Sequence, residues 1–346
     1  MIRNRNAIRL LCLFCLLVYP AINANLEART IIGQRNDSVS HPLIRHQLGF
    51  DIRPGYIVST HSFLQGDNMQ QKKIDQSLSF HFKYAFRFSK ESNLGRLFPH
   101  TYQGIGISYH TFFSPAELGN PVSVYAFQGS RIAQLSPRLS LDYEWNFGAS
   151  FGWKKYDELS NPQNVLIGSK INAYINLGFL LNWQVHKYWK LAAGVDLTHF
   201  SNGNTHYPNG GLNVIGGRIG IVRTLGETDE AAGSITPGRL FIKPHVSYDL
   251  VIYGATRKRG LIGDDVSSMI PGSFGVAGIN FAPMYNFNNY FRAGLSADAQ
   301  YDESANLKEY RVGEYYSGDL KFHRPPFRKQ FAMGLSLRAE LVMPIF

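Results

Sequence analysis

Cysteine is almost absent from this sequence of 346 residues, which contains only Cys12 and Cys15. Both lie in a short apolar run that follows three arginines and leads to the small residue Ala24. A basic start, a short apolar run and a small residue at the cleavage point are typical of a secretory signal peptide. We therefore expect residues 1–24 to be a signal peptide and residues 25–346 to form one mature domain. That domain has no cysteine, which excludes disulfides, thiol chemistry and cysteine metal sites.

Long apolar runs and charged residues are also scarce. No stretch after the signal peptide reaches the roughly 18 apolar residues of a membrane-spanning helix, and only 17% of the residues are charged. The chain has 33 glycines and 14% aromatic residues, a composition typical of many strands and tight turns. Its formal net charge is +10, or +7 after subtraction of the three signal-peptide arginines. A basic exported protein suits anionic lipid or polysaccharide, although an ordinary solvated surface gives the same count. No phosphate loop, metal-protease motif or nucleic-acid module is present, so we expect no nucleic acid partner.

Apolar and polar residues alternate over unusually long segments. Every second residue from Leu139 to Trp153 is apolar, and the residues between them are small or polar. The same period appears in residues 171–183 and 240–252. A strand of about ten residues, apolar outside and polar inside, indicates a transmembrane barrel, because only closure pairs every backbone group in lipid. The sequence therefore predicts an all-β chain folded as a transmembrane antiparallel β-barrel. A secreted β-sandwich is the alternative.

About 12 such strands can be counted along the chain. They lie near residues 47–58, 76–89, 103–112, 121–131, 138–152, 166–183, 189–200, 210–224, 239–253, 273–287, 291–301 and 330–346. An even count returns the chain to the periplasm, so connections after odd-numbered strands should face outside the cell. The chain ends on Phe346, and a terminal aromatic residue resembles the signal that the barrel-assembly machinery reads. Inward-pointing charges such as Glu144 and Arg218 should be paired, since a barrel of this size has limited free bore; a small-solute channel is the alternative.

One short segment, residues 197–213, carries candidate chemistry. His199 and Ser201 lie two apart at the end of a predicted strand, so their side chains share a face. That face continues an apolar stripe, which places both polar groups on the lipid-facing wall at the outer rim. Asn213 shares its face with the apolar positions of the next strand, and a hairpin between the strands brings it beside His199. Polar groups on such a wall are costly unless they are paired or functional.

A serine beside a histidine, with a third residue that holds the ring, is the arrangement that activates a hydroxyl for acyl transfer. Ser201 would attack an ester carbonyl, His199 would take its proton, and Asn213 would orient the imidazole. The turn formed by Asn202, Gly203 and Asn204 would direct backbone N–H groups at the oxyanion. The chemistry needs no cofactor. The alternative is an inactive barrel in which the same segment is only a hairpin turn.

The segment resembles the motif of the lipid A 3-O-deacylases of Gram-negative outer membranes, in which His-x-Ser-Asn is followed by Pro-Asn-x-Gly. The His-Phe-Ser-Asn-Gly-Asn form is similar to family members of Bacteroidetes-type bacteria, often labelled acyloxyacyl hydrolases. Those deacylases fold as an 8-stranded barrel, whereas this chain has room for more strands. The similarity is strong over about 25 residues, and elsewhere it extends only to the barrel pattern. The matching positions are His199, Ser201, Asn202, Pro208, Asn209 and Gly211.

The segment departs from the deacylases at one position, because Asn213 stands where the family has a glutamate. Outer-membrane phospholipase A also resembles this segment: it has His-x-Ser-Asn-Gly, an asparagine twelve residues after the serine, and a 12-stranded barrel. The resemblances imply an outer-membrane serine esterase that removes an ester-linked acyl chain from lipid A, with lipopolysaccharide as substrate and outer-membrane lipids around it. The alternatives are a phospholipase A acting on glycerophospholipids, for which calcium would be a cofactor, and an inactive barrel or pore.

Overall fold

The computed structural model describes residues 44–226, 240–262, 267–270, 272–312 and 319–342. The expected signal peptide and Phe346 lie outside these residues. Among them, no helix is long and apolar enough to cross a membrane.

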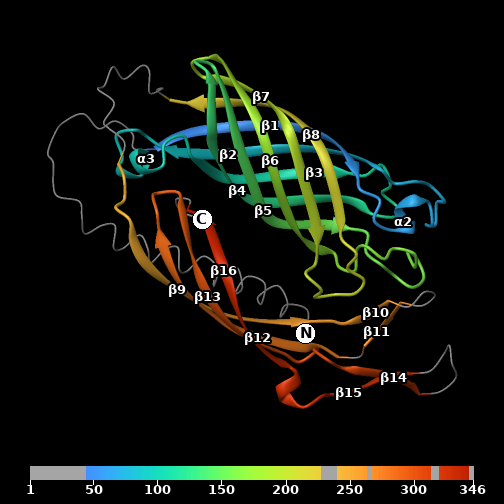
Figure 1. Ribbon diagram of the computed structural model, residues 1–346. Coiled ribbons are helices and arrows are strands. Elements are labelled where there is room, and N and C mark those ends of the chain that lie inside the picture. The colour runs from blue at the N-terminus through green and yellow to red at the C-terminus, as the bar shows by residue number, and fades with distance from the viewer. Residues whose placement is uncertain (1–43, 227–239, 263–266, 271, 313–318, 343–346) are drawn as a thin grey trace, which may run out of the picture.

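The first eight strands form a closed antiparallel barrel (Figure 1). Two short helices, α2 (Ser62–Gln65) and α3 (Asn93–Leu97), lie in the connections after the first and second strands. Each strand is long, and apolar and polar residues alternate along it, because one face forms the outer wall and the other lines the interior. The strands are β1 (Ile44–Ile57), β2 (Gln76–Phe88), β3 (Tyr102–Thr111), β4 (Gly119–Ser136), β5 (Leu139–Trp153), β6 (Ile171–His186), β7 (Trp189–Ser201) and β8 (Leu212–Leu225).

The barrel closes after eight strands rather than the expected 12 or so. Strand β8 pairs with β1 from His46↔Leu225 to Ile57↔Val214, and this pairing occupies the edge that a ninth strand would need. An ion pair of 2.8 Å between Arg218 on β8 and Asp51 on β1 crosses the junction inside the barrel. Gly220 makes room there, since a Cβ at this position would lie 2.2 Å from Asp51 Oδ1.

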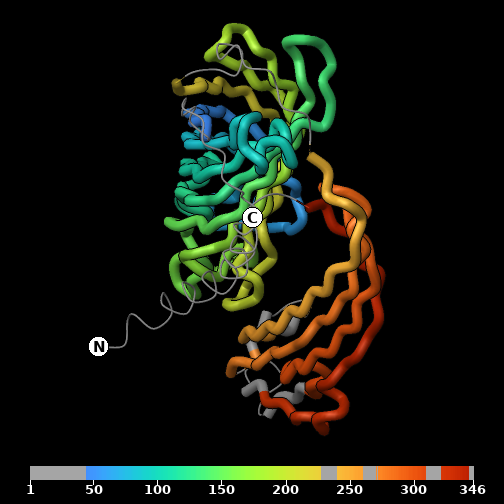
Figure 2. The backbone as a smooth tube through the Cα atoms, turned by 90° about the vertical axis from the view of Figure 1, so that its left-hand side faces the viewer, coloured from blue at the N-terminus to red at the C-terminus, as the bar shows by residue number. Residues whose placement is uncertain are grey.

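Four further long strands, β9 (His245–Arg257), β12 (Phe274–Asn286), β13 (Phe291–Asp302) and β16 (Phe331–Leu341), form a separate sheet in the order β16-β13-β12-β9. We call this the second sheet. Figure 2 shows it as a curved layer, orange to red, beside the barrel. Two short hairpins and a short 3-10 helix, Phe327–Lys329, lie in its connections. All 12 predicted segments therefore overlap a long strand, but they divide into eight and four. The hairpin strands are β10 (Gly260–Ile262) with β11 (Ser267–Met269), and β14 (Lys308–Val312) with β15 (Asp319–His323).

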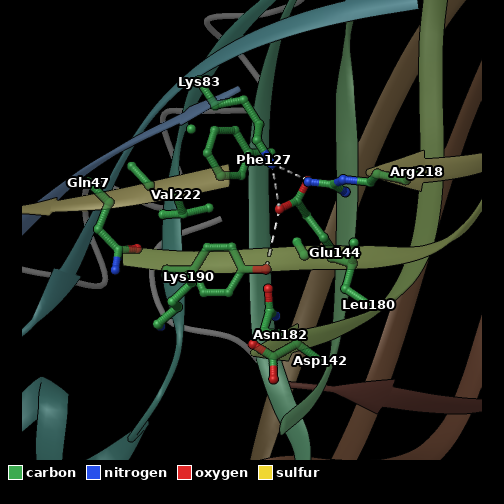
Figure 3. A pocket seen from close by; sticks show the side chains of 14 residues that line it. Gln47, Lys83, Phe127, Asp142, Glu144, Leu180, Asn182, Lys190, Arg218 and Val222 are labelled. Atoms are coloured by element: carbon green, nitrogen blue, oxygen red, sulfur yellow. Dashed lines mark hydrogen bonds and ion pairs between the residues drawn. The ribbon is translucent and has the colours of Figure 1, made fainter. Parts of the chain in front are cut away.

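The barrel interior is polar and ion-paired, as the sequence predicts. Glu144 on β5 forms ion pairs with Lys83 on β2 at 3.1 Å and with Arg218 on β8 at 2.9 Å, and all three side chains are buried. Figure 3 shows Lys83 and Arg218 both directed at Glu144. Asp51 also contacts both cations, at 2.9 and 2.8 Å. The cavity beside these groups is about 40 Å³, so paired side chains fill the lumen near this level.

Candidate active site

The candidate residues lie on the outer face of the barrel, where β7 ends and β8 begins. On β7 the exposed positions alternate with buried ones, and His199 and Ser201 continue the row of Val195 and Leu197, which are 60% and 56% exposed. The alternate row points inward and includes buried Asp196 and Phe200. On β8, Asn213 belongs to the row that contains the exposed Ile215, Ile219 and Ile221.

The strand register brings His199 and Asn213 together. They are direct partners in the β7–β8 pairing, and the His199 Nδ1–Asn213 Oδ1 distance is 2.7 Å. A carbonyl oxygen only accepts hydrogen bonds, so Nδ1 must be the protonated nitrogen. This leaves Nε2 of a neutral imidazole with its lone pair free to accept a proton. Asn213 therefore fixes both the tautomer and the orientation of the ring.

The ring is inclined toward the level of Ser201. A Cβ placed on Gly211 would lie 3.0 Å from His199 Cε1 and 3.8 Å from Nε2. Phe200 and Leu212 form the last pair of the β7–β8 ladder. Ser201 follows Phe200 and Gly211 precedes Leu212, so both lie one residue beyond this pair. The Nε2 side of the imidazole faces this level. Within the described residues Ser201 makes no hydrogen bond with the ring; such contacts are often long before substrate binds.

The turn after Ser201 is held by its own side chains. The Asn202 N–H donates to Asn209 Oδ1 at 2.8 Å, and the Asn202 carbonyl accepts from Thr205 N–H and Oγ1 at 3.2 and 2.8 Å. Gly203 and Asn204 both have left-handed backbone conformations, with φ of 62° and 61°. In the described part of the chain, no protein acceptor binds the N–H group of Gly203 or Asn204. The Asn202 N–H, by contrast, would reach a substrate only if Asn209 turned away.

Buried aromatic rings support the site from inside the barrel. Phe200, between the two candidate residues, is fully buried and packs edge-on against Trp153, with ring centroids 4.9 Å apart. The loop after β5 covers the other end of the turn, because Gly210 and Gly211 donate their N–H groups to the carbonyls of Val165 and Leu166 at 3.1 and 3.2 Å. These contacts hold the end of β7 and the turn in one conformation.

The second sheet also reaches this turn. The backbone N–H of Lys258, which follows β9, donates to the Asn204 carbonyl at 2.9 Å. Lys258 and Lys155 lie near enough to His206 to lower its pKa, although burial of the ring is the larger cause. His206 is thus a neutral loop residue at pH 7, and two lysines stand close to the candidate site.

Three features of the site go beyond what the sequence pattern predicted. Asn209 is part of the deacylase-like motif, but its role as the acceptor for Asn202 depends on the folded turn. Gly211 is also part of the motif, and its lack of a side chain leaves space for the His199 ring. The contact of Lys258 joins segments 54 residues apart, and no periodic pattern indicates it. Among the described residues, no group of three or more histidine and acidic side chains has the geometry to hold a metal ion.

Two family models match the chain. The one described as Lipid A 3-O-deacylase (PagL) matches residues 79–222, which run from β2 to β8 and include all of the candidate site. The one described as Acyloxyacyl hydrolase, C-terminal domain, matches residues 246–346, which contain all of the second sheet except its first residue, His245. Together the two matches cover more than half of the chain, and the chain belongs to the lipid A 3-O-deacylase and acyloxyacyl hydrolase family. Its family and its closed barrel with an apolar outer wall make it a β-barrel protein of the Gram-negative outer membrane.

Solved structures of outer-membrane proteins are similar to this member of the family at low identity. Neisserial surface protein A is 8% identical, with a TM-score of 0.34, over 51% of this chain and 96% of that one. The outer membrane enzyme PagL is 12% identical, with a TM-score of 0.33, over 50% and 97%. The outer membrane protein AlkL is 10% identical, with a TM-score of 0.29, over 59% and 99%. No curated protein matches the chain.

Proposed function

We propose that this chain is a serine esterase that removes an ester-linked acyl chain from lipid A, with Ser201, His199 and Asn213 as its catalytic residues. The observation that carries the proposal is the His199–Asn213 hydrogen bond on the outer wall, two residues from a serine on the same face. Family membership gives the reaction class, and the position of the site on the outer wall, beside exposed apolar side chains, gives access to a substrate whose acyl chains lie in the outer leaflet.

The geometry supports a two-step acyl transfer. Ser201 Oγ bonds to the ester carbonyl carbon while its proton passes to His199 Nε2. The bond from that carbon to the sugar oxygen then breaks, and His199 returns the proton to the departing oxygen. Water attacks the acyl-serine in the second step, again giving a proton to His199, and the fatty acid leaves as Ser201 recovers its hydrogen. Asn213 keeps Nδ1 protonated throughout, so Nε2 is always the nitrogen that exchanges the proton.

The oxyanion is stabilised by N–H groups of the turn after the nucleophile. Gly203 and Asn204 supply the donors, since their N–H groups have no acceptor within the described protein, while Asn202 holds the turn through Asn209. Donors fixed in advance stabilise the developing charge without reorganisation, and removing one such donor costs about 100- to 1000-fold in rate.

The substrate lies along the wall of β7. Below His199 the same face presents Leu197, Val195 and Leu191, all exposed, and a shallow apolar groove lies between Leu181, Ala193 and Ile219 on β6 to β8. An acyl chain that enters at Ser201 can run down this stripe with no polar group in its way. Lys258 and Lys155, at the top of the wall beside the turn, favour an anionic head group, and lipid A carries phosphate there.

A phospholipase A activity is the second candidate, because the orienting residue is Asn213 rather than a glutamate. Both reactions use the same nucleophile, and the substrate distinguishes them. The purified protein in detergent should be offered lipid A and a glycerophospholipid, each with and without calcium, and released fatty acid should be quantified by mass spectrometry.

Release from lipid A without calcium, abolished in Ser201→Ala and retained in Ser160→Ala, is the expected result. Ser160 is a suitable control because it lies in the exposed loop after β5, and its hydrogen bonds within the described residues are with Asp157. Calcium-dependent release from the glycerophospholipid alone would replace the proposal with the phospholipase. Equal release by wild type and Ser201→Ala would exclude both.

A further inference from the structure

The second sheet is amphipathic in the same way as the barrel wall. One face is apolar and almost uncovered, with Leu335 and Leu337 87% and 88% exposed and Ile252 75% exposed. Its other face carries the charged and hydroxyl groups: Arg292 pairs with Asp249 at 2.9 Å, and Ser296 bonds with Ser336 at 2.6 Å. The apolar face includes Val246, Leu250 and Ile252 on β9, Phe281 on β12, and Leu335 and Leu337 on β16.

Both edges of this sheet are open. Strand β9 pairs only with β12, and β16 pairs only with β13, within the described ranges. Their free edges extend over 13 and 11 residues, respectively. In lipid each unpaired backbone group costs several kcal/mol, which is why membrane-spanning sheets are closed. In water the same edges and the apolar face would promote aggregation. The sheet thus needs a partner that supplies strands.

The curvature of the sheet indicates the size of the barrel that it would form if its edges were paired. Arg338 on β16 and Asp249 on β9 lie three strand positions apart, yet their side chains are 3.6 Å apart. In a flat sheet, strands so placed are separated by about 14 Å. The eight-stranded barrel shows the same relation, since Glu144 on β5 contacts Lys83 on β2 and Arg218 on β8, each three positions away. The second sheet therefore has the curvature of one half of an eight-stranded barrel.

We propose that the missing half is the second sheet of another copy of this chain, so that two copies form one intermolecular eight-stranded barrel. Strand β9 of each copy would pair with β16 of the other. Strands alternate in direction across the sheet, so β9 and β16 are antiparallel to each other. A two-fold axis along the barrel keeps both copies in the same membrane orientation and makes both new junctions antiparallel and equivalent.

This arrangement accounts for the open edges and the uncovered apolar face of the isolated sheet. It pairs both free edges, turns the apolar face to lipid on all sides, and places the Asp249 and Arg338 groups in a closed polar interior. Three copies would give 12 strands and a wider barrel, in which edge strands of one sheet would be too far apart for the 3.6 Å contact. The proposal is independent of the esterase activity, because the candidate active site lies on the other barrel.

The test uses cysteine cross-linking in the full chain in its membrane, which the expected loss of both native cysteines with the signal peptide makes specific. Leu335→Cys on β16 is combined with Val246→Cys, Leu250→Cys or Ile252→Cys on β9, because barrel strands are staggered and the register at the junction must be sampled. Within one chain, edge strands three positions apart cannot form a disulfide, whose Cα atoms lie within about 7 Å. The control combines Leu335→Cys with Phe281→Cys, because Phe281 lies on the interior strand β12 and pairs there with Leu250 of β9.

At least one edge pair should give a disulfide-linked dimer on a non-reducing gel, while the control stays monomeric. Native mass spectrometry of the unmodified protein in detergent should give twice the monomer mass, which keeps the test decisive even if a cysteine variant folds poorly. A monomer or a trimer by native mass, dimer formation equal in the control, or capture of a protein of different mass would each overturn the proposal.

Discussion

The His199–Asn213 hydrogen bond makes a quantitative prediction about the Asn213→Ala variant. The bond is neutral and partly exposed, and a neutral hydrogen bond contributes about 0.5–1.5 kcal/mol. Each 1.36 kcal/mol is tenfold in rate, so the direct loss is about 2- to 13-fold. Without Asn213 the His199 ring can adopt either tautomer, which lowers the rate by a small further factor. We therefore expect kcat to fall about tenfold with little change in KM, because Asn213 orients the ring and touches no substrate atom.

The measurement is steady-state release of fatty acid from lipid A by the purified protein. Ser201→Ala provides the reference for full loss, since removing the nucleophile of such a triad costs about a million-fold. Ile215→Ala, two residues along the same face of β8, is the matched control and should retain wild-type kcat. The reasoning would be refuted by an Asn213→Ala variant as inactive as Ser201→Ala, or by one that is indistinguishable from wild type.

Three further variants test separate parts of the structure. Asn213→Asp keeps the 2.7 Å geometry and adds a charge that stabilises the imidazolium, so kcat should rise about fivefold and the acidic limb of its pH profile should move upward; a fall in kcat would show that the site is matched to a neutral partner. Gly211→Ala should lose about 1–2 kcal/mol of stability from its left-handed backbone and lose activity because its Cβ would lie 3.0 Å from the His199 ring; unchanged kinetics would contradict the ring position. Glu144→Gln should lower the unfolding temperature, with a cost of about 3 kcal/mol, at the low end of the range for a broken buried pair because Asp51 still contacts both cations; an unchanged unfolding temperature would show that Glu144 adds nothing to the barrel.

The strands themselves could be predicted from the sequence because each depends on a local pattern. The alternation from Leu139 to Trp153 fixes both the strand and its faces, and β5 has those bounds in the structure. Closure is different, since it depends on which strand pairs with β1. That choice is made by contacts distant in sequence, such as Asp51 with Arg218 and the space at Gly220. Glycines on β8 such as Gly220 make room for this pairing, but in a period-two pattern they look like ordinary small residues.

The candidate site follows the same division. The positions of His199 and Ser201 on one face, and of Asn213 on the matching face of the next strand, follow from parity alone. Parity does not predict which N–H donors of the turn remain free, because the Asn202 N–H donates to a side chain seven residues away. The approach of Lys258 depends on the second sheet, whose place beside the barrel no local pattern encodes.

The most direct test of the central claim is the mass spectrum of lipid A from cells that express the wild-type protein or Ser201→Ala at equal outer-membrane levels. We expect wild-type cells to contain a lipid A species lighter by one ester-linked acyl chain, and Ser201→Ala cells to contain only the fully acylated form. The same deacylated species in both strains, or in neither, would contradict it.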